Sequence, residues 1–159
     1  MDTKAFRSAL GRFATGVCLI SVDDPDSGAM AMTANSFASV SLEPALVLWS
    51  IQNDSECFRE YTQCSRFGIS VLNDQQTALS NQYARKGQHA INDNDFIRDS
   101  NGIPLLRDAL AQFSCQLHQL HEAGDHHIIV GQVEAFSVAD GTPLLFFGGA
   151  YNRLPQAGQ

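Results

Sequence analysis

The sequence predicts a mainly β protein, an antiparallel barrel or sandwich with two or three flanking helices. Strand-like apolar runs follow one another directly more often than they alternate with helical patterns, which favours antiparallel neighbours over a doubly wound sheet. The chain has 159 residues, of which 44% are hydrophobic, so it can bury a core without a disulfide or a metal. We expect residues 1–159 to form a single domain.

The N-terminal part of the chain predicts a helix followed by a hairpin. Apolar side chains between residues 6 and 17 recur at helical spacing, and Gly16 is the expected end of that helix. Residues 17–22 have a strand pattern, and residues 23–28 (Asp-Asp-Pro-Asp-Ser-Gly) are dense in turn residues. Because the next segment, 29–42, is rich in small and hydroxyl residues and carries apolar ones, a hairpin is the simplest interpretation.

The middle of the chain predicts two strands, each followed by a helix. Residues 45–51 (Ala-Leu-Val-Leu-Trp-Ser-Ile) have the length and the β-rich composition of a buried strand. The polar residues 53–55 are candidate caps for a helix over 55–63. A second strand and helix are expected over 67–72 and 75–83.

The last part of the chain predicts a long loop and three more strands. Residues 86–101 are polar and rich in turn signals, and a loop of this length in a small domain is usually functional or disordered. Strands are expected over 113–121, over 126–138 with a bend at Gly131, and over 144–147.

Charge and cysteine usage exclude several classes of protein. The net charge is −7 and the pI is near 5.0, without the basic stripe of a nucleic-acid binder. No apolar run approaches the roughly 20 residues of a membrane helix, and residues 1–13 lack the continuous apolar stretch of a signal peptide. Cys18, Cys57, Cys64 and Cys115 match neither a zinc motif nor a disulfide framework. We expect free thiols in a reducing, cytoplasmic setting.

The segment Thr33–Ser39 (Thr-Ala-Asn-Ser-Phe-Ala-Ser) carries the chemistry that a flavin requires. Hydroxyl and amide side chains supply hydrogen-bond donors at close spacing, and the alanines let the backbone approach a planar ring. The alternative is a Ser/Thr-rich edge strand that faces water, and composition alone favours this alternative.

Phosphate-binding groups are expected near the start of one helix and after another. Ser50 and residues 53–55 follow an apolar strand, where they can cap the helix, hold a phosphate, or do both. Arg85 and Lys86 form an isolated basic pair before a glycine, which is either a phosphate contact or part of a solvated loop. The sequence has no dinucleotide-binding Gly-x-Gly-x-x-Gly fingerprint.

Histidines cluster late in the chain without forming a metal-binding pattern. His118 and His121 point to opposite faces of a strand, as do His126 and His127, so no metal is expected. His126 follows Gly-Asp in a turn and is either a donor to a cofactor or substrate, or a satisfied turn residue. Tyr151, after two glycines, either stacks on a ring or covers the end of the barrel.

Taken together, five segments resemble the short-chain flavin reductases, the small components of two-component flavin monooxygenases. Residues 6–17 resemble the opening of these proteins, and residues 33–44 resemble their central motif. Residues 67–72, 124–126 and 143–151 match as well, in the same order along the chain.

The resemblance implies a six-stranded antiparallel Greek-key split barrel that dimerises with flavin near the interface. It implies reduction of FMN or FAD by NADH or NADPH, with the reduced flavin passed to an oxygenase component. By position, His126 would lie at the nicotinamide and Tyr151 near the same opening, with Arg85 and Lys86 near the phosphates. The remaining flavin contacts would be Thr33, Ala34, Asn35, Ser36, Ser50, Ile51 and Ser55.

Two departures from the family pattern leave questions open. Residues 43–45 contain one proline where the family often has two, and Cys57 stands where the family often carries a hydroxyl. If Cys57 faces the phosphate, one donor is lost and the choice between FMN and FAD is undecided. The alternative function is a split-barrel module that holds flavin or haem without turnover, with His126 or His127 as the axial ligand of a haem.

Overall fold

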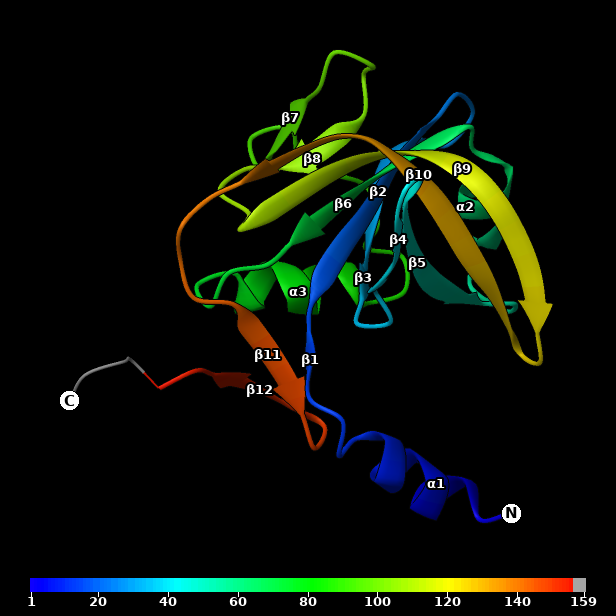
Figure 1. Ribbon diagram of the computed structural model, residues 1–159, viewed down its shortest axis with the longest axis vertical. Coiled ribbons are helices and arrows are strands. Elements are labelled where there is room, and N and C mark those ends of the chain that lie inside the picture. The colour runs from blue at the N-terminus through cyan, green and yellow to red at the C-terminus, as the bar shows by residue number, and fades with distance from the viewer. Residues whose placement is uncertain (156–159) are drawn as a thin grey trace.

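The computed structural model describes residues 1–155 and is built around a large antiparallel sheet that coils into an open barrel (Figure 1). The strand order is β3-β2-β6-β9-β10-β5-β4, so the two edge strands, β3 and β4, are consecutive in the chain. The prediction of a mainly β antiparallel protein is confirmed, and β4 makes the sheet of the described residues seven-stranded rather than six-stranded. The strands are β2 (Cys18–Asp24), β3 (Gly28–Ala34), β4 (Ala38–Leu42), β5 (Ala45–Gln52), β6 (Arg66–Val71), β9 (Ala111–Ala123) and β10 (His126–Val138).

Two small sheets and three helices complete the described part of the chain. The helices are α1 (Thr3–Leu10), α2 (Phe58–Gln63) and α3 (Thr77–Tyr83). Neither α1 nor the other two has the length and apolar character needed to cross a membrane. The small sheets are β1 (Thr15–Gly16) with β11 (Leu144–Phe147) and β12 (Ala150–Arg153), and β7 (Phe96–Arg98) with β8 (Pro104–Leu106).

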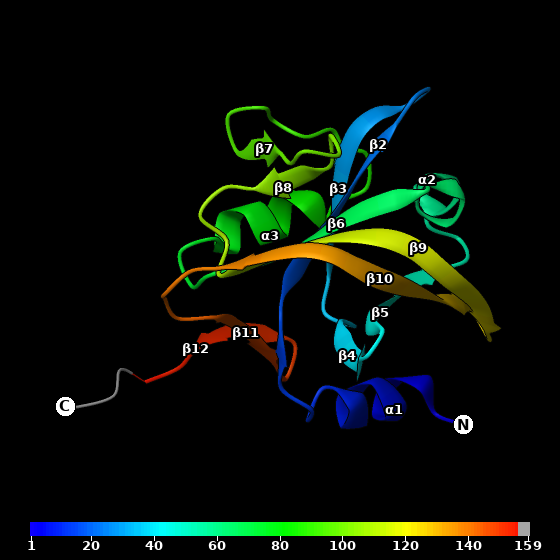
Figure 2. The same ribbon diagram turned by 45° about the horizontal axis from the view of Figure 1, so that its top comes forward.

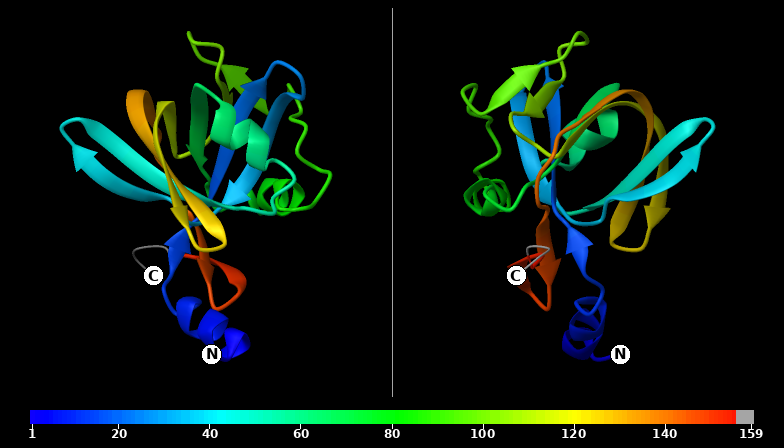
Figure 3. Two further views of the ribbon diagram at one scale, coloured as in Figure 1. Left: turned by 90° about the vertical axis from the view of Figure 1, so that its right-hand side faces the viewer. Right: turned by 60° about the vertical axis from the view of Figure 1, so that its left-hand side comes forward.

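The first helix is shorter than its sequence pattern predicts. Asp2 caps its start by accepting the backbone N–H groups of Lys4 and Ala5, and the helix ends at Leu10. The expected end at Gly16 is wrong because β1 pairs with β11, so that Val17 packs in the core as part of the barrel. Tertiary pairing has overridden a local periodicity. The helix α1 projects from the barrel in both views of Figure 3.

The helices α2 and α3 begin two or three residues later than predicted. The helix α2 begins at Phe58, because residues 53–57 form a turn, and Cys57 rather than residues 53–55 occupies the N-cap position. The backbone N–H of Cys57 donates to Ser55 Oγ at 3.3 Å, so Ser55 still satisfies one donor close to the helix. In α3 the N-cap position is Gln76, without a side-chain cap.

The predicted loop 86–101 is ordered by the edge of the sheet. The backbone N–H of Ala31 donates to His89 O at 2.8 Å, and the N–H of Ile91 donates to Ala29 O at 3.2 Å. Through these hydrogen bonds the loop lies alongside β3. It covers this edge strand, which would otherwise expose unpaired backbone N–H and C=O groups. The last part of the segment forms strand β7, which the sequence did not predict.

The interior of the barrel is filled by aromatic rings. The rings of Trp49 and Tyr61 meet edge to face with centroids 5.2 Å apart, and Phe67 lies 6.1 Å from Trp49. All three side chains are fully buried, and Tyr61 Oη donates to Ile20 O at 2.7 Å. A second core lies where α3 covers the sheet (Figure 2), and it includes Leu19. The strand β2 is therefore buried on both faces, which explains its nearly continuous apolar sequence.

Candidate active site

A cavity of about 350 Å³ opens between the corner that joins β3 to β4, the end of β5 and the loop after α3. It brings together all of the predicted site residues except Arg85 and Tyr151. Its size falls in the range of pockets that hold small organic ligands. The lining residues are Met32, Thr33, Ala34, Asn35, Ser36, Ser50, Ile51, Gln52, Asp54, Ser55, Glu56, Tyr83, Ala84, Lys86, His89 and His126.

Ser36 fixes the corner between β3 and β4 against β5. Its Oγ accepts the backbone N–H of Ser50 at 2.9 Å and donates to Ser50 O at 3.3 Å. The hydroxyl is therefore used within the protein, whereas the sequence predicted it as a flavin contact. One acceptor lone pair remains, so the main effect of Ser36 is to position the backbone of the cavity wall.

Thr33 is used in a similar way, and it links the cavity to Tyr151. Thr33 Oγ1 donates to Ser80 O at 2.6 Å, and Ser80 Oγ lies 2.6 Å from Tyr151 Oη. Tyr151 lines an adjoining hollow of about 190 Å³, which shares Thr33, Ala34 and Asn35 with the cavity. The structure thus puts Tyr151 and His126 in two adjoining hollows rather than at one opening.

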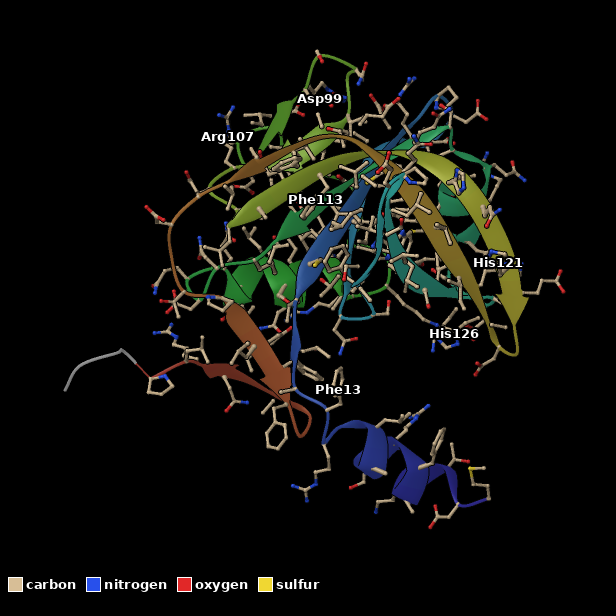
Figure 4. All side chains as sticks on the ribbon, viewed as in Figure 1. Phe13, Asp99, Arg107, Phe113, His121 and His126 are labelled. Atoms are coloured by element: carbon tan, nitrogen blue, oxygen red, sulfur yellow. The ribbon has the colours of Figure 1, made fainter. Side chains whose placement is uncertain are left out.

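His126 lies at the start of β10, beside the turn that joins it to β9 (Figure 4). Its Nδ1 is 2.7 Å from Asp125 Oδ1, which calls for a proton on Nδ1 and directs the tautomer. This hydrogen bond and the charge of the imidazole hold the pKa of the Asp125 carboxyl below its usual value. The side chain of His126 is about one-third exposed, so Nε2 is available to a ligand in the cavity.

One cluster in the cavity wall was not predicted from the sequence. Glu56 accepts the backbone N–H of Gly87 and lies 2.8 Å from Nε2 of His89. Lys86, which was predicted, stands close enough that its charge lowers the pKa of Glu56. The length of the loop 86–101 was the only signal that pointed here. Arg85 is exposed and lines neither hollow.

Residues 10–155 match the sequence profile of the family described as flavin reductase like domain. The chain belongs to this family. It is 43% identical over 153 residues to the FMN reductase (NADH) SmoA of Agrobacterium fabrum, a match that spans 96% of this chain and 87% of that protein. The predicted family and its split-barrel fold are confirmed.

Solved structures of other flavin reductases have the same fold over nearly the whole chain. The NADH:FAD oxidoreductase SgcE6 of Streptomyces globisporus, in complex with NAD and FAD fragments, superposes with a TM-score of 0.92 at 32% identity, covering 99% of this chain and 96% of that one. The styrene monooxygenase flavin reductase of Pseudomonas putida gives a TM-score of 0.85 at 31% identity, covering 94% and 97%.

The donors of this flavin reductase like domain fit a flavin. Ala34 leaves room for a planar ring, while Ser55 and Lys86 offer a hydroxyl and an ammonium to a phosphate. Cys57 belongs to the hydrophobic core and does not line the cavity, so its thiol removes no donor from the wall. FMN and FAD are therefore not distinguished by this departure.

His127 and the cysteines Cys57 and Cys64 pack against other parts of the protein. His127 Nδ1 lies 2.7 Å from Asn53 Oδ1, and its ring packs edge to face on Phe58 at 4.9 Å. Within residues 1–155, no group of three or more His, Cys, Asp or Glu side chains is arranged to hold a metal. Cys57 and Cys64 are both free, and burial raises the pKa of each thiol to about 11, which disfavours the reactive thiolate.

Proposed function

We propose that this protein reduces FMN or FAD with NADH or NADPH and delivers the reduced flavin to a monooxygenase component. The observation that supports this most is the cavity, which gathers Asn35, Ser50, Ser55, Lys86 and His126 from separate elements. The FMN reductase activity named for the Agrobacterium relative and the monooxygenase named for the Pseudomonas structure support the same function.

The protein contributes binding and orientation to this reaction. When bound, the flavin accepts a hydride from the reduced nicotinamide, and this chemistry belongs to the two ligands. The Ser36 hydrogen bonds hold the β3–β4 corner rigid, so that backbone donors next to Asn35 meet the flavin in a fixed geometry. His126, oriented by Asp125, stands at the rim and would direct Nε2 toward the nicotinamide.

The test is oxidation of NADH and of NADPH, followed at 340 nm, with FMN, FAD and riboflavin as acceptors. We expect turnover that requires both a nicotinamide and a flavin. A protein that binds flavin but leaves it oxidised in the presence of NADH and NADPH would instead be a non-catalytic module, and a Soret band on purification would identify a haem protein.

His126→Ala is expected to raise the KM for the nicotinamide about tenfold while the Kd for flavin stays within about twofold, since one charge-assisted contact is lost. Steady-state kinetics with varied NADH, together with a flavin titration, measure the two quantities. His121→Ala is the matched control because His121 is exposed on β9 and lines neither hollow. Unchanged kinetics in His126→Ala would remove this role.

We further propose that the protein is a homodimer in a reducing compartment such as the cytoplasm. Every residue of α1 is exposed, including the apolar Phe6 and Leu10, and Phe13 just after it is 80% exposed. Phe136 and Val138 on β10 are 74% and 80% exposed. Exposed apolar side chains of this kind favour burial against a partner. The four free cysteines agree with a reducing compartment.

Sedimentation equilibrium tests the dimer. We expect a mass of about twice the 17.3 kDa of the chain, and a shift toward that of a single chain in the double variant Phe6→Ser, Phe13→Ser. Because both side chains are exposed in the single chain, the variant should keep its circular dichroism spectrum. A wild-type protein that sediments as a monomer at 50 μM, roughly the concentration at which weak homodimers already form, would contradict the proposal.

A further inference from the structure

The cluster at Glu56 joins three separate parts of the cavity wall. His89 Nε2 lies 2.8 Å from Glu56 Oε1, on the turn before α2, and His89 Nδ1 lies 3.1 Å from Ala31 O, on β3. The backbone N–H of Gly87 donates to the same carboxylate oxygen. The side chain of His89 is only 15% exposed, so little water reaches the ring. Glu56 and Ala31 O are therefore the main hydrogen-bond partners of its two nitrogens.

The two partners of His89 specify its charge. A carbonyl oxygen accepts hydrogen bonds and never donates them, so Nδ1 must carry a proton to bond Ala31 O. The Gly87 N–H, followed by the His89 contact, holds the pKa of Glu56 below its usual value, so the carboxylate is ionised and Nε2 must also carry a proton. The ring that satisfies both contacts is the positively charged imidazolium.

This charge changes the balance of the cavity. Among the lining residues that the structure describes, Asp54 and Glu56 carry negative charge, and Lys86 is the permanent cation. Tyr83 and His126 line the cavity as well, and Arg85 lies next to Lys86 on the exposed side of the loop. With His89 charged, Asp54 and Glu56 are matched by Lys86 and His89, while His126 is paired with Asp125 outside the lining. Without the positive charge of His89, the negative charge of Glu56 has no cation of its own, because Lys86 alone would face both Asp54 and Glu56.

We propose that His89 neutralises Glu56 and thereby gives the cavity its affinity for phosphorylated flavins, FMN above riboflavin. The inference rests on the proposed function and assigns a specificity role to this ion pair. The flavin phosphate carries close to two negative charges at neutral pH. An unpaired Glu56 carboxylate in the same wall would repel it, whereas riboflavin has the same ring system and no phosphate. His89 is a positioning and specificity residue in this scheme and takes no part in the reduction.

The test compares the dissociation constants of FMN and riboflavin, measured by quenching of flavin fluorescence at one pH and ionic strength. His89→Gln keeps a hydrogen-bond donor and removes the charge, and it should weaken FMN binding by about tenfold or more, as expected for repulsion between like charges in a partly solvated site. Riboflavin binding should change by less than about twofold. Glu56→Gln should tighten FMN binding, and the double variant should return it to within about threefold of the wild type.

His121→Gln serves as the control, and thermal melting checks that each variant is folded. Equal weakening of FMN and riboflavin by His89→Gln would show a structural role and overturn the inference, as would a double variant that is not restored. If His89→Gln does not fold, a Glu56→Gln variant that binds FMN and riboflavin as the wild type does would overturn it. A wild type that reduces FMN while its variants show no change in selectivity refutes this inference alone. A wild type that binds no flavin refutes the proposed function as well.

Discussion

Replacing Gly131 by alanine is expected to lower the free energy of unfolding by about 2–3 kcal/mol, the upper part of the range for overpacking a core. A Cβ at this position would lie 2.5 Å from Cζ of Phe67 and 3.1 Å from Cβ of Cys115. Phe67 cannot move freely, because it is fully buried against Trp49. Urea unfolding measures the loss, and the melting temperature should fall by roughly 5–10 °C for a chain of this size.

Gly16→Ala is the matched control for this prediction. Gly16 lies in β1 with no atom within 4 Å of the position of a Cβ, so the change should stay within about 0.5 kcal/mol of the wild type. The double variant Gly131→Ala, Phe67→Leu should recover part of the loss, since the smaller side chain makes room for the methyl group. A Gly131→Ala protein as stable as the wild type would contradict the prediction, because it would mean that Phe67 and Cys115 can shift to make room for the methyl group.

Gly131 also illustrates how far local patterns specify this fold. A bend was predicted at this glycine, and the register between β10 and β9 shifts between Val130 and Gly131. Residues 45–51 and 144–147 were predicted within one residue of β5 and β11, because their apolar content coincides with their burial. These elements could be predicted since side-chain chemistry and backbone preference agree.

The errors come from elements with a weak local signal. Strand β1 is two residues long and forms by pairing Thr15 with Phe146, far along the chain, while β7 is a three-residue strand that pairs with the nearby β8. The periodicity that predicted a helix as far as Gly16 includes Phe13, whose side chain lies in solvent in the single chain. Long-range pairing of this kind is not encoded in any short window of sequence.

For the candidate site, too, the location could be predicted from local sequence, whereas the contacts between distant residues could not. The composition of Thr33–Ser39 and the isolated Lys86 were sufficient to locate a polar cavity. The sequence did not reveal that the Ser36 hydroxyl hydrogen-bonds the backbone of Ser50. Nor did it reveal that Glu56 pairs with His89, which is 33 residues further along the chain. Donor-rich segments therefore predicted where the cavity lies better than they predicted which atoms face it.

Filling the cavity should have the largest effect on function. Ala34→Phe is expected to reduce flavin-dependent NADH oxidation by more than about a hundredfold, because the ring would occupy space that a planar ligand needs. Ala34 lines both the cavity of about 350 Å³ and the adjoining hollow of about 190 Å³, so a large side chain there intrudes on one or the other. Flavin titration should show weakened binding, rather than normal binding with slow turnover.

Stability must be measured alongside, since Ala34 also packs against the core of the barrel. The side chain is only partly buried, so the loss of stability should stay within about 2 kcal/mol while activity disappears. Ala78→Phe, on the exposed face of α3, adds the same ring outside both hollows and should leave the activity within about twofold, as expected for a surface site. An Ala34→Phe enzyme that is folded and still reduces FMN at the wild-type rate would show that the flavin binds elsewhere.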